Sequence, residues 1–190
     1  MPVTKQRSTR EAILDRAVDL ASEEGLEGLT IGRLAAEMEM SKSGLFGHFG
    51  SKQGLQMATV DAAASRFADE VVAPALEERP GLPRLEALCD RYIGYMEGEV
   101  FSGGCFWGSV TAEFDDRPGP VRDRIGDRVG AWLELLEQEA KEAGAQDPAQ
   151  LAFELFAVAQ AANTGFRLFG DRQAFVQART AVDRLLKPLG

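Results

Sequence analysis

The sequence predicts an all-helical protein of about nine helices, and three observations support this fold class. Apolar residues recur at intervals of three and four positions along most of the 190-residue chain. Capping residues such as Ser8 and Asp171 stand directly before helical patterns, and glycine or proline separates many of these patterns. We find no convincing strand pattern in the sequence.

Composition and charge place the chain among ordinary globular proteins, with 45% hydrophobic and 27% charged residues. The net charge of -9 argues, by itself, against nucleic acid as a partner. The charge is unevenly distributed, however. Residues 1–52 contain seven Lys/Arg and eight Asp/Glu (net -1), whereas residues 53–190 contain fourteen and twenty-two (net -8). The acidic surplus therefore belongs to the second part of the chain.

Metal and membrane functions find little support in the sequence. Two cysteines, Cys89 and Cys105, and one histidine cannot build a zinc finger or a Cys/His cluster, so we predict no metal and no other cofactor. The longest apolar stretch, residues 151–166, is interrupted by polar residues and is too short to cross a bilayer. No secretory segment follows Met1, so we expect a cytoplasmic protein with free thiols.

The first helix is expected over residues 8–24. Ser8 and Glu11 have the spacing of a capping box, in which each side chain accepts a backbone N–H of the first turn. Apolar residues then follow at helical spacing, and Gly25 supplies a residue that readily ends a helix.

Residues 30–49 contain two short helical patterns with hardly any connection between them. Thr30 can cap the first and Ser41 the second. Because helices of about two turns bury little on their own, both are expected to pack on the first helix as a three-helix unit. A tight pair of this kind can insert its second helix end-first into the major groove of DNA, where the helix N-terminus attracts phosphate.

Further helices are expected beyond this unit, separated by breaks that contain proline or glycine. The last two carry broad apolar faces with several alanines, which suits close helix packing. The expected ranges are 51–74, 85–96, 105–114, 120–140, 149–169 and 172–186.

Three segments make a resemblance specific: Thr30–Ala36, Met40–Phe49 and Ser51–Leu55. They resemble the N-terminal DNA-binding domain of the TetR family of transcriptional regulators, and the similarity covers residues 8–56. The resemblance implies a helix-turn-helix domain with a basic N-terminal arm over residues 1–52 and a ligand-binding and dimerisation domain over residues 53–190. It also implies a homodimeric repressor that binds a palindromic operator in double-stranded DNA and is released by a small-molecule effector.

The resemblance places ten residues at or near DNA. Phe46 stands where the family most often has tyrosine, and Glu39 stands where it commonly has glycine in the turn. Thr30 and Ser41 are also expected to be helix caps, and Lys42 and Lys52 are also compatible with a solvated surface. The implied DNA-binding residues are Thr30, Arg33, Ser41, Lys42, Ser43, Gly44, Leu45, Phe46, His48 and Lys52.

The second part of the chain is rich in aromatic residues, most of which are expected in the core. A subset is expected to line a cavity for an effector of apolar or aromatic character. Three glycines around two large rings in residues 103–108 indicate a close helix approach or a mobile pocket wall, and a tightly packed corner is an equally open interpretation. The predicted ligand-binding residues are Tyr92, Met96, Cys105, Phe106, Trp107, Phe156, Asn163 and Phe166.

Two other function classes remain open at this point. One is an enzyme or small-molecule carrier centred on Cys105 and the aromatic cluster, with Cys105 as a redox sensor or simply a buried apolar residue. The other is a helical adaptor whose short helices bind protein. Because no phosphate-binding loop, nucleophile elbow or metalloprotease motif is present, the sequence favours a regulator over an enzyme.

Overall fold

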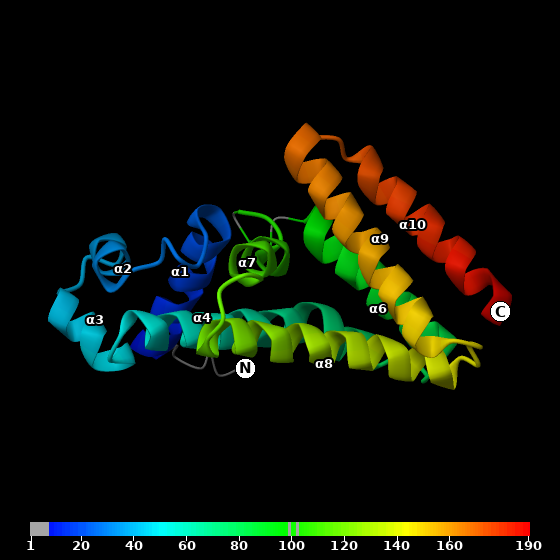
Figure 1. Cartoon of the computed structure of the whole chain (residues 1–190), viewed down its shortest axis with the longest axis horizontal. Coiled ribbons are helices and arrows are strands. Elements are labelled where there is room, and N and C mark those ends of the chain that lie inside the picture. The colour runs from blue at the N-terminus through cyan, green and yellow to red at the C-terminus, as the bar shows by residue number, and fades with distance from the viewer. Residues whose placement is uncertain (1–7, 99, 102) are drawn as a thin grey trace, which may run out of the picture. The chain divides into compact units, whose positions relative to one another are not determined.

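The computed structural model describes residues 8–98, 100–101 and 103–190, and every regular element in these residues is a helix (Figure 1). The prediction of an all-α fold is confirmed. In these described ranges nine helices have seven or more residues, and each occurs where the sequence predicts one. They are α1 (Thr9–Glu24), α2 (Ile31–Glu37), α3 (Lys42–Phe49), α4 (Lys52–Phe67), α6 (Leu82–Glu97), α7 (Phe106–Phe114), α8 (Pro120–Glu142), α9 (Pro148–Phe169) and α10 (Gln173–Leu186).

Three shorter elements extend these helices. A π-helical turn η1 (Ala68–Val72) and the short α5 (Ala73–Ala75) continue α4, so this region reaches the expected Pro74. A 3₁₀ turn η2 (Lys187–Leu189) follows α10. Within the described ranges, no helix combines the length and apolar character needed to cross a membrane.

The start of α1 has the predicted capping box. The backbone N–H of Ser8 donates to the Glu11 carboxylate at 2.8 Å, and the N–H of Glu11 donates to the Ser8 hydroxyl at 3.2 Å. Gly25 ends the helix with φ +82°, a backbone conformation that L side chains rarely adopt. Lys5 and Arg7, which belong to the predicted basic arm, lie outside the described residues, whereas Arg10 lies in α1.

The chain divides into two compact units. Unit 1 comprises residues up to Ala63 together with Phe101–Arg124, and unit 2 comprises Ala64–Val100 together with Ile125–Gly190. Unit 1 therefore contains α1, α2, α3 and α7, and α4 and α8 contribute residues to both units. The functional boundary predicted between residues 52 and 53 stays a prediction. The predicted boundary divides the chain at one position, whereas each packing unit combines segments that are far apart in the sequence.

The core of unit 1 is mainly aliphatic, and its buried aromatic residues are Phe101, Phe106, Trp107 and Phe114. Phe106 is fully buried beside Trp107, with ring centroids 5.3 Å apart. Leucines from successive elements complete this core, so the three short N-terminal segments share one apolar interior. The largest fully buried aliphatic residues are Ile13, Leu20, Leu26, Leu29, Leu34, Leu45 and Leu55.

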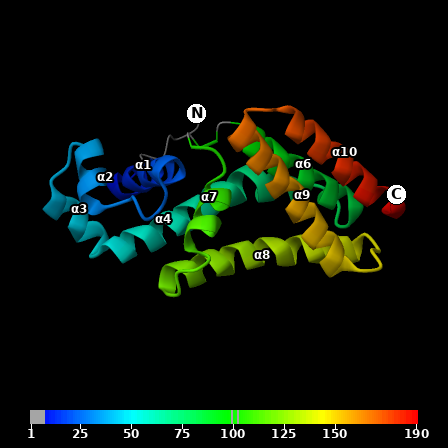
Figure 2. The same cartoon turned by 45° about the horizontal axis from the view of Figure 1, so that its top comes forward.

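The core of unit 2 is built from α6, α9 and α10, which lie side by side (Figure 2), with aromatic residues added from α4 and α8. The Phe67 ring makes edge contacts with Tyr95 at 5.3 Å and with Trp132 at 5.0 Å between centroids. Phe175 on α10 is fully buried and lies 5.1 Å from the Phe166 ring on α9. Contacts of this edge-on kind add to the stabilisation from buried area.

Candidate nucleic-acid interface

The turn between α2 and α3 is tight and has the expected caps. Thr30 accepts the N–H of Arg33 at 3.1 Å, and Ser41 accepts the N–H of Gly44 at 3.1 Å. Between the helices, Glu39 adopts φ +53°, the only positive φ among the described residues other than glycine. The turn thus keeps a conformation that suits glycine, although a side chain stands there at some cost in strain.

One face of α3 is open to solvent. Lys42, Ser43, Gly44 and His48 are exposed, and the Phe46 side chain is 52% exposed. The Ser41 and Ser43 hydroxyls lie 3.3 Å apart at the helix start. The N-terminal half of α3 therefore combines small hydroxyls, a lysine and the amides of a helix N-terminus, which is the chemistry that binds phosphate and base edges.

Leu45 corrects the predicted DNA-binding set. Its side chain is fully buried in unit 1, so it does not reach the surface that α3 presents. The physical reason is helical geometry, because a two-turn helix that packs on its neighbours must turn at least one residue inward. The resemblance implies DNA-binding positions along α3 without distinguishing the buried face of the helix from its exposed face.

The end of α3 is held against the start of α1. The Arg10 guanidinium lies 5.5 Å from the centroid of the half-buried Phe49 ring, which is a cation–π distance. His48, in the last turn of α3, is exposed beside this contact. A basic residue of the N-terminal segment is therefore placed next to the helix that the resemblance assigns to DNA.

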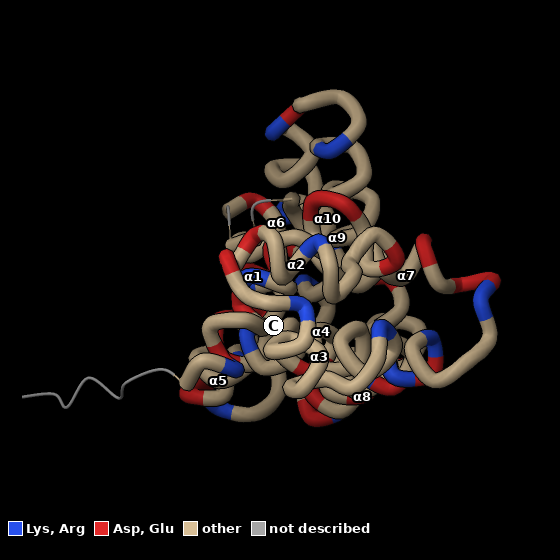
Figure 3. Tube along the Cα trace, turned by 90° about the vertical axis from the view of Figure 1, so that its left-hand side faces the viewer, with Lys and Arg blue, Asp and Glu red and all other residues tan. Residues whose placement is uncertain are grey.

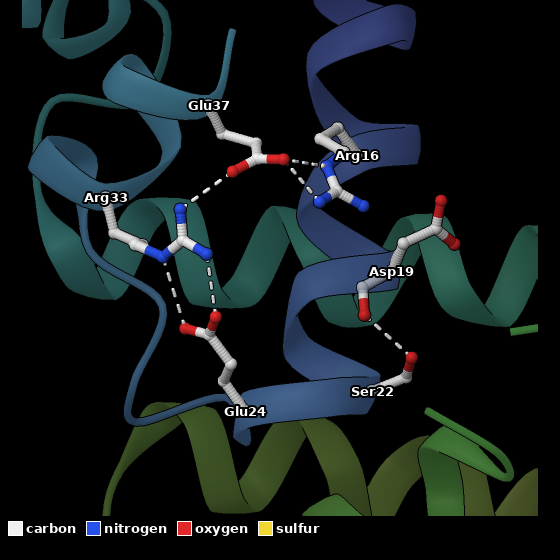
Figure 4. A network of polar contacts seen from close by, with 6 residues as sticks. All are labelled: Arg16, Asp19, Ser22, Glu24, Arg33 and Glu37. Carbon is white, nitrogen blue, oxygen red and sulfur yellow. Dashed lines mark hydrogen bonds and ion pairs between the residues drawn. The ribbon is translucent and has the colours of Figure 1, made fainter. Parts of the chain in front are cut away.

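Arg33 is engaged in an acidic network (Figure 4). Its guanidinium pairs with Glu24 at 2.8 Å and with Glu37 at 2.7 Å, and Glu37 also pairs with Arg16 on α1. The hydrogen bond from Arg33 lowers the pKa of Glu24, and those from Arg16 and then Arg33 lower that of Glu37. The two carboxylates in turn raise the pKa of Arg33. In this state Arg33 orients α2 on α1, and a contact with DNA backbone would have to share or replace these partners.

Lys52 is also engaged by an acid. Its ammonium pairs with Glu27, and this hydrogen bond is the main cause that lowers the pKa of the Glu27 carboxyl. Gln56 and Arg117 lie at 3.4 and 3.8 Å from the same carboxylate. By contrast, within the described ranges no ion pair involves Lys42, whose side chain lies over the start of α2 near Gly32.

Figure 3 views the molecule from the side on which α2 and α3 lie in Figure 1. In this view, acidic and basic positions are interspersed along the trace. This agrees with the near-neutral balance of residues 1–52, seven Lys/Arg against eight Asp/Glu.

A connection that the sequence did not indicate joins α7 to the loop after α1. The Glu113 carboxylate accepts the N–H of Leu26 at 2.7 Å and the N–H of Glu27 at 2.9 Å. A Cβ at Gly25 would lie 2.9 Å from a Glu113 oxygen, so glycine there also admits this carboxylate. Glu113 is one acid among 30 in the chain, and only the fold distinguishes it.

Gly103 makes a second close contact on the same side of α1. Its N–H donates to the Ser22 hydroxyl at 3.0 Å, and a Cβ at this position would lie 2.0 Å from the Ser22 carbonyl oxygen. Residues 103–108 therefore make a close backbone contact at Gly103, which agrees with either a close approach or a tightly packed corner. Only glycine allows two backbone segments to approach this closely.

The predicted ligand-binding residues are divided between the units. Cys105, Phe106 and Trp107 belong to unit 1, where all three are buried. Unit 2 contains the other five: Tyr92, Met96 and Asn163, which are buried, and Phe156 and Phe166, which are half-buried. The eight residues therefore do not lie in one packing unit, and their role in ligand binding stays a prediction.

Burial keeps both thiols protonated. Desolvation raises the pKa of Cys105 to about 11 and that of Cys89 to about 12. Because the thiolate is the reactive form, this protonation disfavours both a redox sensor and a nucleophile at Cys105 at neutral pH. The geometry agrees with the interpretation of both cysteines as small apolar core residues.

Two family models match the chain. The model described as "Bacterial regulatory proteins, tetR family" matches residues 13–58, which contain α2, α3 and most of α1. The model described as "Tetracyclin repressor-like, C-terminal domain" matches residues 81–182, more than half of the chain.

Individual proteins show the same similarity. The HTH-type transcriptional repressor AcnR of Corynebacterium glutamicum is 35% identical over 74 residues, which cover 39% of each chain. This chain covers 59% and 39% of the length of the two curated relatives that it matches. The structure of SCO4454, a TetR-family regulator from Streptomyces coelicolor, aligns with a TM-score of 0.83 at 22% identity, covering 95% of both chains. The structure of AibR in complex with isovaleryl coenzyme A and operator DNA aligns with a TM-score of 0.72 at 23% identity, covering 91% of this chain and 95% of AibR.

Proposed function

Because the chain belongs to the TetR family of bacterial regulatory proteins, we propose that it is a DNA-binding transcriptional regulator, namely a repressor that a small-molecule effector releases from a palindromic operator. The observation that carries this proposal is the exposed, N-capped face of α3 beside a tight turn. AcnR, which is named as a repressor, and AibR, which was crystallised with operator DNA and a coenzyme A thioester, support the same role.

The first turn of α3 enters the major groove in this proposal. Ser43 and Phe46 lie on the exposed face, so they are the side chains proposed to read base edges, with Phe46 contacting a thymine methyl group. Lys42, Ser41, Gly44 and His48 are proposed to contact phosphate. Thr30 holds the start of α2, while Arg33 and Lys52 reach phosphate only by exchanging their carboxylate partners.

A homodimer would form through α9 and α10. These helices pack on one another and still expose four large apolar side chains, Phe153, Leu168, Phe169 and Val176. An apolar surface of this kind is typical of an obligate interface. A two-fold axis there would present two copies of α3 to the two half-sites of a palindrome, at a separation of about one DNA turn or a related spacing.

The effector would bind within the helical body and favour the conformation with lower affinity for DNA. A regulatory rather than a catalytic role is proposed, because both thiols are buried and protonated. We also propose a cytoplasmic location, because a regulator that binds an operator must reach the bacterial DNA. The enzyme and adaptor alternatives have no observation in their favour.

A mobility-shift titration tests the proposal. The probe is the DNA upstream of the protein's own gene, scanned in overlapping fragments at several salt concentrations. We expect one fragment with a palindrome to form a specific complex whose affinity falls steeply with salt, because phosphate contacts release counterions. Absence of any specific, salt-sensitive complex with a palindromic site would overturn the proposal.

Two kinds of variant separate the proposed roles. Lys42→Ala is expected to weaken binding to all sequences and to lower the salt slope by about 1. Ser43→Ala and Phe46→Ala are expected to relax base preference at single positions, and each should weaken binding to the preferred base by about 1–3 kcal/mol. Lys141→Ala is the matched control, since Lys141 is an exposed lysine in unit 2.

A further inference from the structure

The interior of unit 2 contains a small cavity where α6, α8, α9 and α10 meet. The side chains around it are aliphatic, aromatic or thiol, and the lining includes no charged group. Its volume open to a water molecule is about 10 Å³, so the surrounding side chains almost fill it in this state. The lining residues are Cys89, Tyr92, Ile93, Trp132, Leu136, Leu155, Ala159 and Val182.

One polar atom of this lining has no partner. The Trp132 side chain is 7% exposed, and in the part of the chain that the structure describes no acceptor lies within hydrogen-bond distance of its indole Nε1. A buried indole N–H normally finds an acceptor, and leaving it without one is costly. The ring itself is held by edge contacts, at 5.0 Å from Phe67 and 5.1 Å from Tyr92.

A second such atom lies further along the same helix face. Asn163 follows the lining residue Ala159 by four positions on α9, which places both residues on one face. The Asn163 side chain is 8% exposed, and its Oδ1 lacks a donor among the described residues. Apolar surface with a donor and an acceptor left open is the composition of a binding site for a small polar-tipped molecule.

Resting on the proposed regulatory function, we infer that the effector is a compact, uncharged molecule with an apolar or aromatic body and one hydrogen-bond acceptor, which accepts from the Trp132 indole N–H. An anionic ligand is disfavoured, because the lining offers no cation and an unpaired charge is strongly penalised in an apolar interior. The protonated state of the Cys89 thiol agrees with such an environment.

The small volume of the cavity limits how a ligand can enter. A molecule the size of a benzene ring cannot enter without moving the side chains or helices around the cavity. Ligand binding therefore selects an opened arrangement of α6, α8 and α9, and the ligand contributes differential affinity for that state. The Trp132 ring on α8 packs against Phe67 and Tyr92, so a shift of this ring would also involve these two side chains.

Direct binding to the full chain without DNA tests the inference, so its outcome is independent of operator binding. The probes are acetophenone, ethylbenzene and benzoate, which match in size but differ in carrying a neutral acceptor, no acceptor or a charge. We expect calorimetry to detect binding of acetophenone and ethylbenzene, and at least about 100-fold weaker binding of benzoate. In NMR spectra, the indole N–H of Trp132 is expected to shift downfield with acetophenone and not with ethylbenzene.

Trp132→Phe isolates the hydrogen bond. It is expected to lower the ratio of acetophenone affinity to ethylbenzene affinity by about 10-fold, the effect of one net hydrogen bond. Trp107→Phe makes the same ring change in unit 1 and is expected to leave this ratio unchanged. An unchanged ratio in Trp132→Phe would overturn the inference, as would benzoate affinity equal to that of acetophenone, or failure of both neutral probes to bind the wild-type chain.

Discussion

Unit 1 and unit 2 both combine buried apolar side chains with polar links between distant segments, and they differ in which segments are joined and in the kind of ring contacts in the core. In unit 1, segments far apart in sequence are joined by polar links: Glu113 binds the N–H groups of residues 26 and 27, and Gly103 binds Ser22. In unit 2, an edge-to-face cluster of large rings lies on the bundle of α6, α9 and α10. Ion pairs and caps thus orient the short helices α2 and α3 in unit 1. In unit 2, the buried Glu139 carboxylate accepts the N–H of Gly81 and pairs with Arg84, and these polar links add to the ring cluster.

The difference follows from helix length. The helices α2 and α3 have seven and eight residues, so each buries few side chains and needs caps and ion pairs to fix its direction. The helices α8 and α9 have 23 and 22 residues and can bury long apolar stripes. The sequence contains two tryptophans, Trp107 in unit 1 and Trp132 in unit 2, so fluorescence of single-Trp variants can follow each unit separately.

The largest expected effect is in unit 2. Phe175→Ala removes a fully buried ring in unit 2 and is expected to lower the free energy of unfolding by about 4 kcal/mol, because apolar burial is reduced and a cavity remains. Urea unfolding followed by Trp132 fluorescence in a Trp107→Phe background measures it. Phe46→Ala, at an exposed ring in unit 1, is the control and should change stability by no more than about 0.5 kcal/mol. Similar destabilisation in both variants would contradict the stated role of burial.

The next effect tests the closest backbone contact of unit 1. Gly103→Ala would place a Cβ 2.0 Å from the Ser22 carbonyl oxygen, so the two segments must separate. We expect stability to fall by about 3 kcal/mol in unfolding followed by Trp107 fluorescence in a Trp132→Phe background. Gly126→Ala has open space at a helical position of α8 and should raise stability by about 0.5–1 kcal/mol. Equal behaviour of the two variants would show that the contact at Gly103 is unimportant.

The polar link from α7 gives a smaller effect. Glu113→Ala removes the acceptor of two backbone N–H groups and is expected to cost about 2 kcal/mol, because hydrogen bonds to a charged group are stronger than neutral ones. Glu113→Gln should recover part of this stability, since one amide oxygen remains. The control is Glu137→Ala, at an exposed acid on α8. Amide exchange at residues 26 and 27 should accelerate in Glu113→Ala, and unchanged exchange there would argue against the link.

The smallest expected effect has the opposite sign. Glu39 stands at φ +53° in the turn before α3, where a side chain is strained and glycine is not. Glu39→Gly is therefore expected to stabilise unit 1 by about 0.5–1 kcal/mol, after allowing for the greater freedom of glycine in the unfolded chain. Glu23→Gly, at an exposed acid in the last turn of α1, should be destabilising. A decrease in stability in Glu39→Gly would mean that the Glu39 side chain makes a favourable contact in the turn.

Much of the fold could be predicted because its signals are local. Ser8, Thr30 and Ser41 cap helices at the positions that their spacing predicts, and Asp171 accepts the N–H of Gln173 at 2.8 Å. These contacts join residues two or three positions apart, so chain geometry almost guarantees them once the helix forms. The α2–α3 pair follows from the same local pattern, which the tetR-family model also matches.

The candidate site was only partly predictable. The residue types on α3 could be read from the sequence, but the burial of Leu45 and the ion pairs of Arg33 and Lys52 depend on which neighbours pack against them. A lysine or arginine near the helix pair indicates a phosphate contact. Only the fold shows that Arg33 and Lys52 already have carboxylate partners.

The sequence by itself determined the helices, their caps and the family to which the chain belongs. Tertiary structure alone decided which distant residues meet: Glu113 at the loop after α1, Gly103 at Ser22, and Trp132 at a cavity without an acceptor. The physical reason is range. Capping and helical periodicity act over a few residues, whereas these contacts join residues up to 87 positions apart, and nothing in the local pattern distinguishes them before the chain folds.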